Sequence, residues 1–242
     1  MSDLKPVYLL AGGRPRNARI FNPLFKEVFK ESGKTNPTIA YVGAASGENK
    51  AFYLMMTAML KGVGAGKIRH AVLSPANADV PKARDILESS DIIYISGGDV
   101  EQGMQVLQEK NLIGFLVGLY QQGKPFFGIS AGSIMLAQEW IRWRDPDDDA
   151  TAEIFPCLGI APVICDTHGE EDGWEELQAL IALEKDKTIG CGIVSGTAIK
   201  VYPNGKIEAI GGAIHQYAKI KGKVERLTDI LPGSTQSNYH DK

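Results

Sequence analysis

Short, fully apolar segments alternate along this chain with segments that carry apolar residues at helical spacing. The clearest apolar segments, each followed by glycine or other small residues, are residues 7–10, 38–42, 92–95 and 126–129. A strand that is apolar at every position must be covered on both faces, which is typical of a parallel sheet between two layers of helices. Residues 21–29 and 51–60 show the spacing of such helices. The chain is therefore predicted to be an α/β protein.

Length and composition exclude several classes of protein. With 242 residues, of which 44% are hydrophobic, the chain can form one full-sized core, so a single domain over residues 1–242 is expected. A net charge of −3 with scattered basic residues gives no sign of nucleic-acid binding. No apolar run is long enough for a membrane span. Residues 1–6 lack a basic segment followed by a long apolar region, so we expect no signal peptide.

The cysteines point to a reducing compartment. The chain has three of them, without the CxxC spacing of a zinc site. An odd number without that spacing favours reduced thiols over a disulfide framework. We therefore expect a cytoplasmic monomer or homodimer that needs no metal or organic cofactor and has no nucleic-acid or membrane partner.

The apolar segment 126–129 ends at a serine with glycine two positions away on each side. These residues are Gly128, Ser130 and Gly132, and a helical pattern begins at Ser133. This arrangement favours a sharp strand-to-helix turn, because a Cβ atom at either glycine would collide with the neighbouring strand or helix. Such a turn exposes the serine hydroxyl and directs backbone N–H groups toward an oxyanion formed beside it. Ser130 is therefore a candidate nucleophile, and the alternative is an ordinary serine in a glycine-rich turn.

Small and polar residues also follow the other predicted strands. They include Gly12, Gly43, Gly97, Gly98 and His168. Because ligands bind beyond the carboxyl ends of the strands in a parallel sheet, we expect these residues and Ser130 to share one rim. Among the four histidines, His168 is the best candidate for a general base, since it follows a predicted strand and lies among polar residues. The alternative for His168 is a histidine in a surface loop.

Three segments in this order resemble peptidase family S51, which includes aspartyl dipeptidase and cyanophycinase. They are Ile-Ser-Gly-Gly-Asp at residues 95–99, Gly-Ile-Ser-Ala-Gly at 128–132 and Asp-Thr-His at 166–168, with later matches at 190–193 and 196–198. The resemblance implies a class I glutamine amidotransferase-like (flavodoxin-like) fold, a three-layer sandwich with a mostly parallel central sheet and a C-terminal β-hairpin. It also implies a serine hydrolase that acts on small peptides or isopeptides.

Position within these motifs implies a role for each residue. Ser130 corresponds to the nucleophile and His168 to the general base, while Gly98 and Ala131 would supply the N–H groups of an oxyanion hole. These are the parts that acyl transfer requires. An α/β-hydrolase esterase is an alternative because GxSxG fits that fold too, although the sequence has no convincing late histidine and no HGGG-type oxyanion motif. Amidotransferase activity is disfavoured because the turn carries serine instead of cysteine.

The first departure from the family concerns the third member of the triad. The family has an acidic residue in the segment that matches residues 192–196, where this chain has Val194 and Ser195. Without a carboxylate, the imidazolium formed during catalysis loses its partner. The residues that could replace it are Asp166, Glu170, Glu171 and Ser195. Asp166 lies two residues before His168, so on an extended strand both side chains would point the same way. The missing acid also keeps open a non-catalytic relative that binds a small peptide or metabolite.

The second departure concerns specificity. Cyanophycinase-like members have arginines after the histidine that hold a substrate carboxylate, whereas residues 169–177 here contain no arginine and five carboxylates. We therefore expect no preference for aspartyl substrates. Candidate substrate-binding residues are Asp99, Glu171, Asp172 and Trp174. The acidic group would favour a cationic substrate, or else it simply stabilises a helix N-terminus. The acidic segment 145–149 is interpreted as a solvated loop, with a lid role left open.

Overall fold

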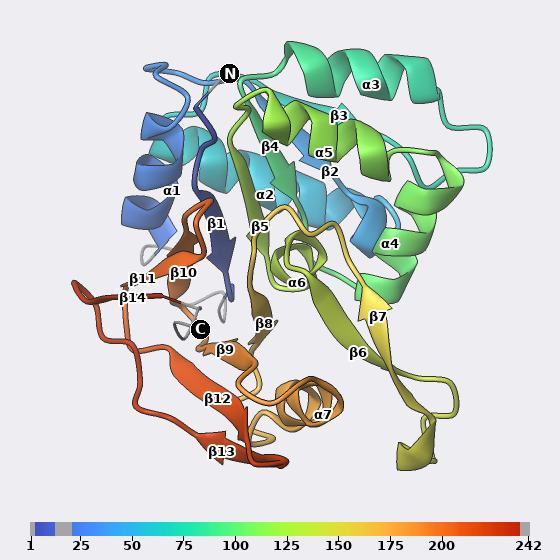
Figure 1. The fold of residues 1–242 in the computed structure, drawn as a ribbon. Helices are drawn as coiled ribbons and strands as arrows, with labels where there is room; N and C mark the ends of the chain where they lie inside the picture. Colours follow the sequence, from blue (N-terminus) through green and yellow to red (C-terminus); the bar gives the residue numbers. More distant parts are fainter. Residues whose placement is uncertain (1–2, 13–20, 238–242) are drawn as a thin grey trace.

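The central feature of the fold is an eight-stranded sheet with helices on both faces (Figure 1). The computed structural model describes residues 3–12 and 21–237, so Gly13 of the first predicted turn lies outside the described residues. The strand order is β14-β11-β10-β1-β5-β4-β2-β3. The parallel strands are β1 (Val7–Leu10), β5 (Phe126–Ile129), β4 (Ile92–Ile95), β2 (Ile39–Val42) and β3 (Ile68–Ala71). The predicted α/β class with a mostly parallel central sheet is confirmed.

Alternate residues of each central strand enter two different cores, as the period of a strand requires. Leu9 packs in the core beneath α3 (Val80–Ser89), α4 (Val100–Glu109), α5 (Ile113–Gln121) and α6 (Ala131–Leu136). Leu10 packs in the opposite core, beneath α1 (Phe21–Lys30) and α2 (Lys50–Val63). Both leucines are fully buried. This two-sided burial explains why the strands are apolar at every position.

Antiparallel strands extend the sheet beyond β1. The predicted C-terminal hairpin is present as β10 (Ala198–Val201) and β11 (Lys206–Ile210), and β10 pairs with β1. The edge of the sheet is β14 (Thr235–Ser237), which pairs with β11. The polar sequence of this last strand gave no signal for it. Within the described residues, no helix has the length and apolar character that crossing a membrane requires.

The strand that precedes His168 belongs to a second sheet and not to the central one. This sheet has the order β13-β12-β9-β8 and contains β8 (Ile164–Thr167), β9 (Ile189–Ile193), β12 (His215–Ile220) and β13 (Lys223–Arg226). Helix α7 (Glu175–Leu183) packs against it. The prediction that His168 follows a central strand is therefore wrong. A short apolar strand looks the same in either sheet, and only its pairing partners decide which sheet it joins.

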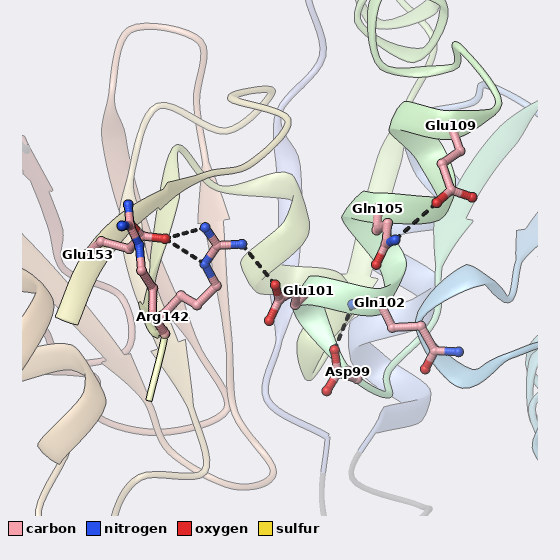
Figure 2. A network of polar contacts seen from close by, with 8 residues as sticks. Asp99, Glu101, Gln102, Gln105, Glu109, Arg142 and Glu153 are labelled. Atoms are coloured by element: carbon pink, nitrogen blue, oxygen red, sulfur yellow. Dashed lines mark hydrogen bonds and ion pairs between the residues drawn. The ribbon is translucent and has the colours of Figure 1, made fainter. Parts of the chain in front are cut away.

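The acidic segment 145–149 lies at the tip of a hairpin that the sequence analysis did not predict. Its strands are β6 (Glu139–Trp143) and β7 (Ala152–Pro156), and they form a separate two-stranded sheet. Arg142 joins this hairpin to the first turn of α4 (Figure 2). Its guanidinium donates to Glu101 at 2.8 Å and, through Nε, to Glu153 at 2.9 Å.

Ser133 fixes α6 to β1 at the end of the central sheet. Its Oγ accepts a hydrogen bond from Leu10 N at 2.9 Å and donates one to Leu10 O at 2.9 Å. Both residues are fully buried. Ser130 N also donates to Leu10 O, at 2.8 Å. One backbone position of β1 thus holds both ends of the turn that contains Ser130.

Ser133→Ala should therefore lower the free energy of unfolding by about 1–3 kcal/mol, because the buried N–H and C=O of Leu10 each lose a partner. Urea denaturation measures this loss. Ser90→Ala is the matched control, since Ser90 is equally buried but its hydroxyl makes one bond, to Ile86 O. The control should lose about 1 kcal/mol or less. Equal losses in the two variants would contradict the role given to Ser133.

Candidate active site

Ser130 lies in a strained turn between β5 and α6. Its backbone angles are φ 54° and ψ −126°, a region that residues with a side chain rarely occupy. The turn is held by the bond from Ser130 N to Leu10 O and by Ser133 N, which donates to Ser130 O at 2.7 Å. The sharp strand-to-helix turn predicted from the sequence is confirmed.

Both flanking glycines are required by close approaches of the main chain. A Cβ atom on Gly128 would lie 2.4 Å from Gly132 O, and one on Gly132 would lie 2.1 Å from Ile95 O. Neither backbone oxygen can move away without displacing the turn or β4. The steric reason given for these glycines from the sequence is therefore confirmed.

The loop after β4 lies beside Ser130. A Cβ atom on Gly97 would lie 3.2 Å from the Cβ of Ser130 and 3.8 Å from its Oγ. Gly98 has φ 144°, and a Cβ atom there would lie 2.0 Å from Ala45 O. Within the part of the chain that the structure describes, the N–H groups of Gly98 and Ala131 donate no hydrogen bond. The first N–H groups of a helix have no partner inside it, so Ala131 can donate to a ligand.

The sequence analysis missed the turn that supports Gly98. This turn, at Ala44–Ser46, presents Ala45 O to the N–H of Asp99 at 2.8 Å. Glu48 anchors it to the loop after β3, because its Oε1 accepts from Leu73 N at 2.8 Å and its Oε2 lies 2.6 Å from His70 Nε2. The only signal in the sequence was the small-residue loop after β2.

The second sheet brings His168 to the end of β1. His168 directly follows the parallel strand β8, and Ser195 lies two residues beyond the end of its neighbour β9. The chain after β9 bonds to the central sheet through Gly196 N, which donates to Gly12 O at 2.5 Å. A Cβ atom on Gly12 would lie 3.3 Å from both Cε1 and Nε2 of His168. It would also lie 3.3 Å from a methyl group of Ile129, the residue before Ser130. His168 therefore reaches the rim of the central sheet although its strand is elsewhere.

His168 has a hydroxyl partner instead of a carboxylate. Its Nδ1 lies 3.1 Å from Ser195 Oγ, and Ser195 N donates to Glu170 Oε1 at 3.0 Å. Burial lowers the pKa of His168 below its ordinary value, and the Glu170 carboxylate only partly offsets this. The imidazole is therefore neutral at pH 7, as a general base must be. Among the described residues no hydrogen bond joins His168 to Ser130, a contact that often forms only when substrate is bound.

Asp166 does not contact His168. His168 has φ 67°, so the chain is no longer extended there and the two side chains do not share a face. Asp166 is buried, with 7% of its surface exposed, and its Oδ1 accepts from Thr167 N at 2.6 Å. The extended backbone from which Asp166 was expected to point toward His168 is therefore not present at His168. Burial raises the pKa of Asp166 to about 7, and the nearby carboxylates of Glu176, Asp172 and Glu170 add to this.

Trp174 lies in the core and not at the surface. It is 1% exposed, and a Cβ atom on Gly169 or Gly192 would lie within 2.8 Å of its ring. Its Nε1 donates to His215 Nδ1 at 2.9 Å. Trp174 supports the loop that carries His168, so it does not fit the substrate-binding role expected from the sequence.

The other acidic residues that the sequence analysis considered for the site are exposed. Asp99 caps α4 through a 2.7 Å bond from Gln102 N, and Asp172 accepts from Trp174 N at 3.0 Å. Glu170 and Glu171 follow His168 in the same loop. In residues 3–12 and 21–237, no group of three or more His, Cys, Asp or Glu side chains could hold a metal ion.

Asp166→Asn should change the pH dependence of stability. The pKa of Asp166 rises from 3.8 to about 7 on folding. A group whose folded pKa is raised contributes stability that is complete below its unfolded pKa and is lost as the pH rises to its folded pKa. Asparagine does not titrate, so wild type should lose stability relative to the variant from about pH 4 to about pH 7, with no further change above. Urea denaturation across this range measures the difference, and a constant difference would contradict the assignment.

Comparisons with known proteins identify the family and the fold of the chain. A model of peptidase family S51 matches residues 7–209. The chain is similar in structure to a peptidase from an acI-B1 Actinobacterium, with 18% identity, 97% of each chain covered and a TM-score of 0.72. It is also similar to a peptidase E candidate from Listeria monocytogenes EGD-e, with 17% identity, 93% of this chain and 100% of that chain covered, and a TM-score of 0.58.

The two kinds of comparison carry different weight. At these identities the structural likeness shows the fold alone, which is of the flavodoxin-like type. No curated protein matches the chain. The family match covers most of the sequence, including every segment that forms the site. The chain therefore belongs to peptidase family S51 and is a serine-type peptidase.

Proposed function

We propose that this protein cleaves small peptides or isopeptides, with Ser130 as nucleophile and His168 as general base. The observation that carries the proposal is the strained backbone of Ser130 at the β5–α6 junction, with the His168 imidazole against Gly12 at the same rim. A positive φ at a residue with a side chain costs stability and typically marks a functional site. The burial that lowers the pKa of His168 supports the second role.

The reaction proceeds by acyl transfer. Ser130 Oγ attacks the substrate carbonyl carbon while His168 Nε2 takes its proton, and the resulting oxyanion accepts hydrogen bonds from Gly98 N and Ala131 N. The C–N bond then breaks, and His168 returns the proton to the leaving amine. Water attacks the acyl-enzyme in the same way, with His168 again as base, and releases the acid product.

The charges near His168 disfavour an acidic substrate. Glu170, Glu171 and Asp172 lie in the loop that follows it, and all three are exposed. Arg142 is bound to Glu101 and Glu153 and is not free to hold a substrate carboxylate (Figure 2). We therefore include in the proposal that the enzyme does not prefer aspartyl peptides.

The thiols support a cytoplasmic location. Cys165 and Cys191 are register partners on β8 and β9, and both are buried and free. Burial raises the pKa of Cys191 to about 12, so it remains a neutral thiol. Neighbouring unpaired thiols are typical of proteins that stay in a reducing compartment.

A fluorophosphonate probe tests the nucleophile. Wild type should gain one adduct, located at Ser130 by peptide mapping, because the probe traps an activated serine. Ser130→Ala should gain none, and Ser234→Ala, which removes an exposed serine hydroxyl, should label as wild type does. Intact-mass spectrometry measures the adduct. Folded wild type that gains no adduct would contradict the proposal and favour a non-catalytic relative that binds a small peptide or metabolite.

A panel of Asp-X, Ala-X and Lys-X dipeptides tests the substrate preference. We expect kcat/KM for Asp-X to be about tenfold below that for Ala-X, because the exposed carboxylates repel it. Raising the salt concentration should narrow this difference, since it screens exposed charges. The highest kcat/KM for Asp-X would contradict the expectation.

A further inference from the structure

The carboxylate of Glu170 lies next to Ser195, the hydroxyl partner of His168, although the family motif has no acid at this position of the chain. Residues 194 and 195, where the family has its acid, are Val194 and Ser195. The Ser195 hydroxyl nevertheless lies 3.1 Å from His168 Nδ1. On the other side of this serine, Glu170 Oε1 accepts from the Ser195 N–H at 3.0 Å.

The topology of the second sheet brings these groups together. Strands β8 and β9 are parallel neighbours, so the residues that follow them lie side by side. His168 and Glu170 follow β8, and Ser195 follows β9. A bond of 2.7 Å from Trp174 N to Gly169 O closes the loop that contains Glu170. The buried Trp174 ring then fixes this loop against Gly192 of β9.

We propose that Ser195 and Glu170 together replace the missing triad acid, with the Ser195 hydroxyl as a bridge between Glu170 and His168 Nδ1. This proposal rests on the proposed function, since it concerns how the base of that reaction is held. Glu170 and Ser195 are positioning residues, because neither one touches the reacting atoms.

The Glu170 carboxylate determines which group donates and which accepts in each hydrogen bond of the bridge. A carboxylate can only accept, and a serine hydroxyl both donates and accepts. When Ser195 donates its proton to Glu170, its lone pair faces His168 Nδ1, which must then carry a proton. Nε2 of His168 is left as the acceptor, and this is the nitrogen against Gly12 at the rim that bears Ser130. The bridge thus selects the tautomer that the reaction needs.

The protonation state of Glu170 fits this direction. Its partial burial favours the neutral acid, but its interactions with Ser195, which include the hydrogen bond from Ser195 N, outweigh this burial and lower its pKa. Glu170 is therefore ionised at neutral pH. When the Ser130 proton moves to Nε2, the imidazolium forms next to this charge, and the protons on Nδ1 and Ser195 stay where they are.

Asp166 does not provide an equivalent contact. It is nearly fully buried on β8, and its Oδ1 accepts a hydrogen bond from Thr167 N. Its pKa of about 7 leaves it half protonated at neutral pH, whereas the lowered pKa of Glu170 keeps that group charged. Glu170, by contrast, accepts a hydrogen bond from the N–H of Ser195, the residue whose hydroxyl is the partner of His168.

Rates of fluorophosphonate acylation of the full-length protein test the bridge. Ser195→Ala and Glu170→Gln should each slow acylation of Ser130 about 10- to 100-fold, the range for losing a hydrogen bond to a charged group. Ser195→Thr keeps the hydroxyl and should stay within about threefold of wild type. Glu175→Gln is the matched control, because it removes an exposed carboxylate at the start of α7 and should leave the rate unchanged.

Two further measurements separate a bridge from a general structural effect. In the double variant Ser195→Ala/Glu170→Gln, the losses should not multiply, because either change alone already breaks the bridge. The pH dependence of the acylation rate should also change when the charge of Glu170 is removed. The Glu170 charge raises the pKa of His168, so Glu170→Gln should move the acidic limb to lower pH, while Glu175→Gln should not.

Each result has a distinct meaning. Slow acylation of the Ser195→Ala and Glu170→Gln variants, together with a near-normal acylation rate for Ser195→Thr, supports the bridge. If wild type labels at Ser130 and Glu170→Gln keeps its rate, or if the two losses multiply fully, the bridge is wrong and the proposed function stands. If folded wild type does not label at all, the proposed function fails and the bridge fails with it.

Discussion

The close approach of three backbone segments around Ser130 is the constraint on which the site depends. Gly128 and Gly132 allow the end of β5, the start of α6 and the end of β4 to meet at distances that exclude any side chain. The strained φ of Ser130 follows from this packing, and the buried hydroxyl of Ser133 holds it in place. Because the strain is fixed by main-chain contacts, the hydroxyl of Ser130, the nucleophile in the proposed function, is presented before any substrate arrives.

The second constraint is the joint between the two sheets. A parallel sheet collects its functional residues beyond the carboxyl ends of its strands, and here two sheets do so at the same place. The central sheet supplies Ser130 and Gly98, and the β8–β9 pair supplies His168 and Ser195. The main-chain hydrogen bond between Gly196 and Gly12 holds the residues from the central sheet next to those from the β8–β9 pair. The position of Ser130 relative to His168, the proposed nucleophile and base, therefore depends on this backbone joint.

Local patterns in the sequence were enough for the central strands, the turn at Ser130 and the hairpin β10–β11. Each of these depends on neighbouring residues, such as the apolar run and the glycines around Ser130. Contacts between distant residues were not accessible in this way. The sequence placed β8 in the wrong sheet and predicted neither β12 nor the β6–β7 hairpin. It also offered Trp174 as a substrate-binding candidate, although this side chain is buried. It also could not choose between Asp166 and Glu170, because that choice depends on the left-handed backbone at His168.

The surroundings of His168 balance two opposing effects on its pKa. Burial against Gly12 lowers it, which keeps the base neutral, and the charge of Glu170 raises it, which helps the imidazolium to form. A directly bonded carboxylate would raise the pKa further and hold the imidazolium more strongly. In the proposed bridge, the Ser195 hydroxyl between the two groups still selects the tautomer of His168, while the charge acts from a greater distance. On this proposal, replacing the family's acid weakens the stabilisation of the imidazolium without removing the orientation of the base.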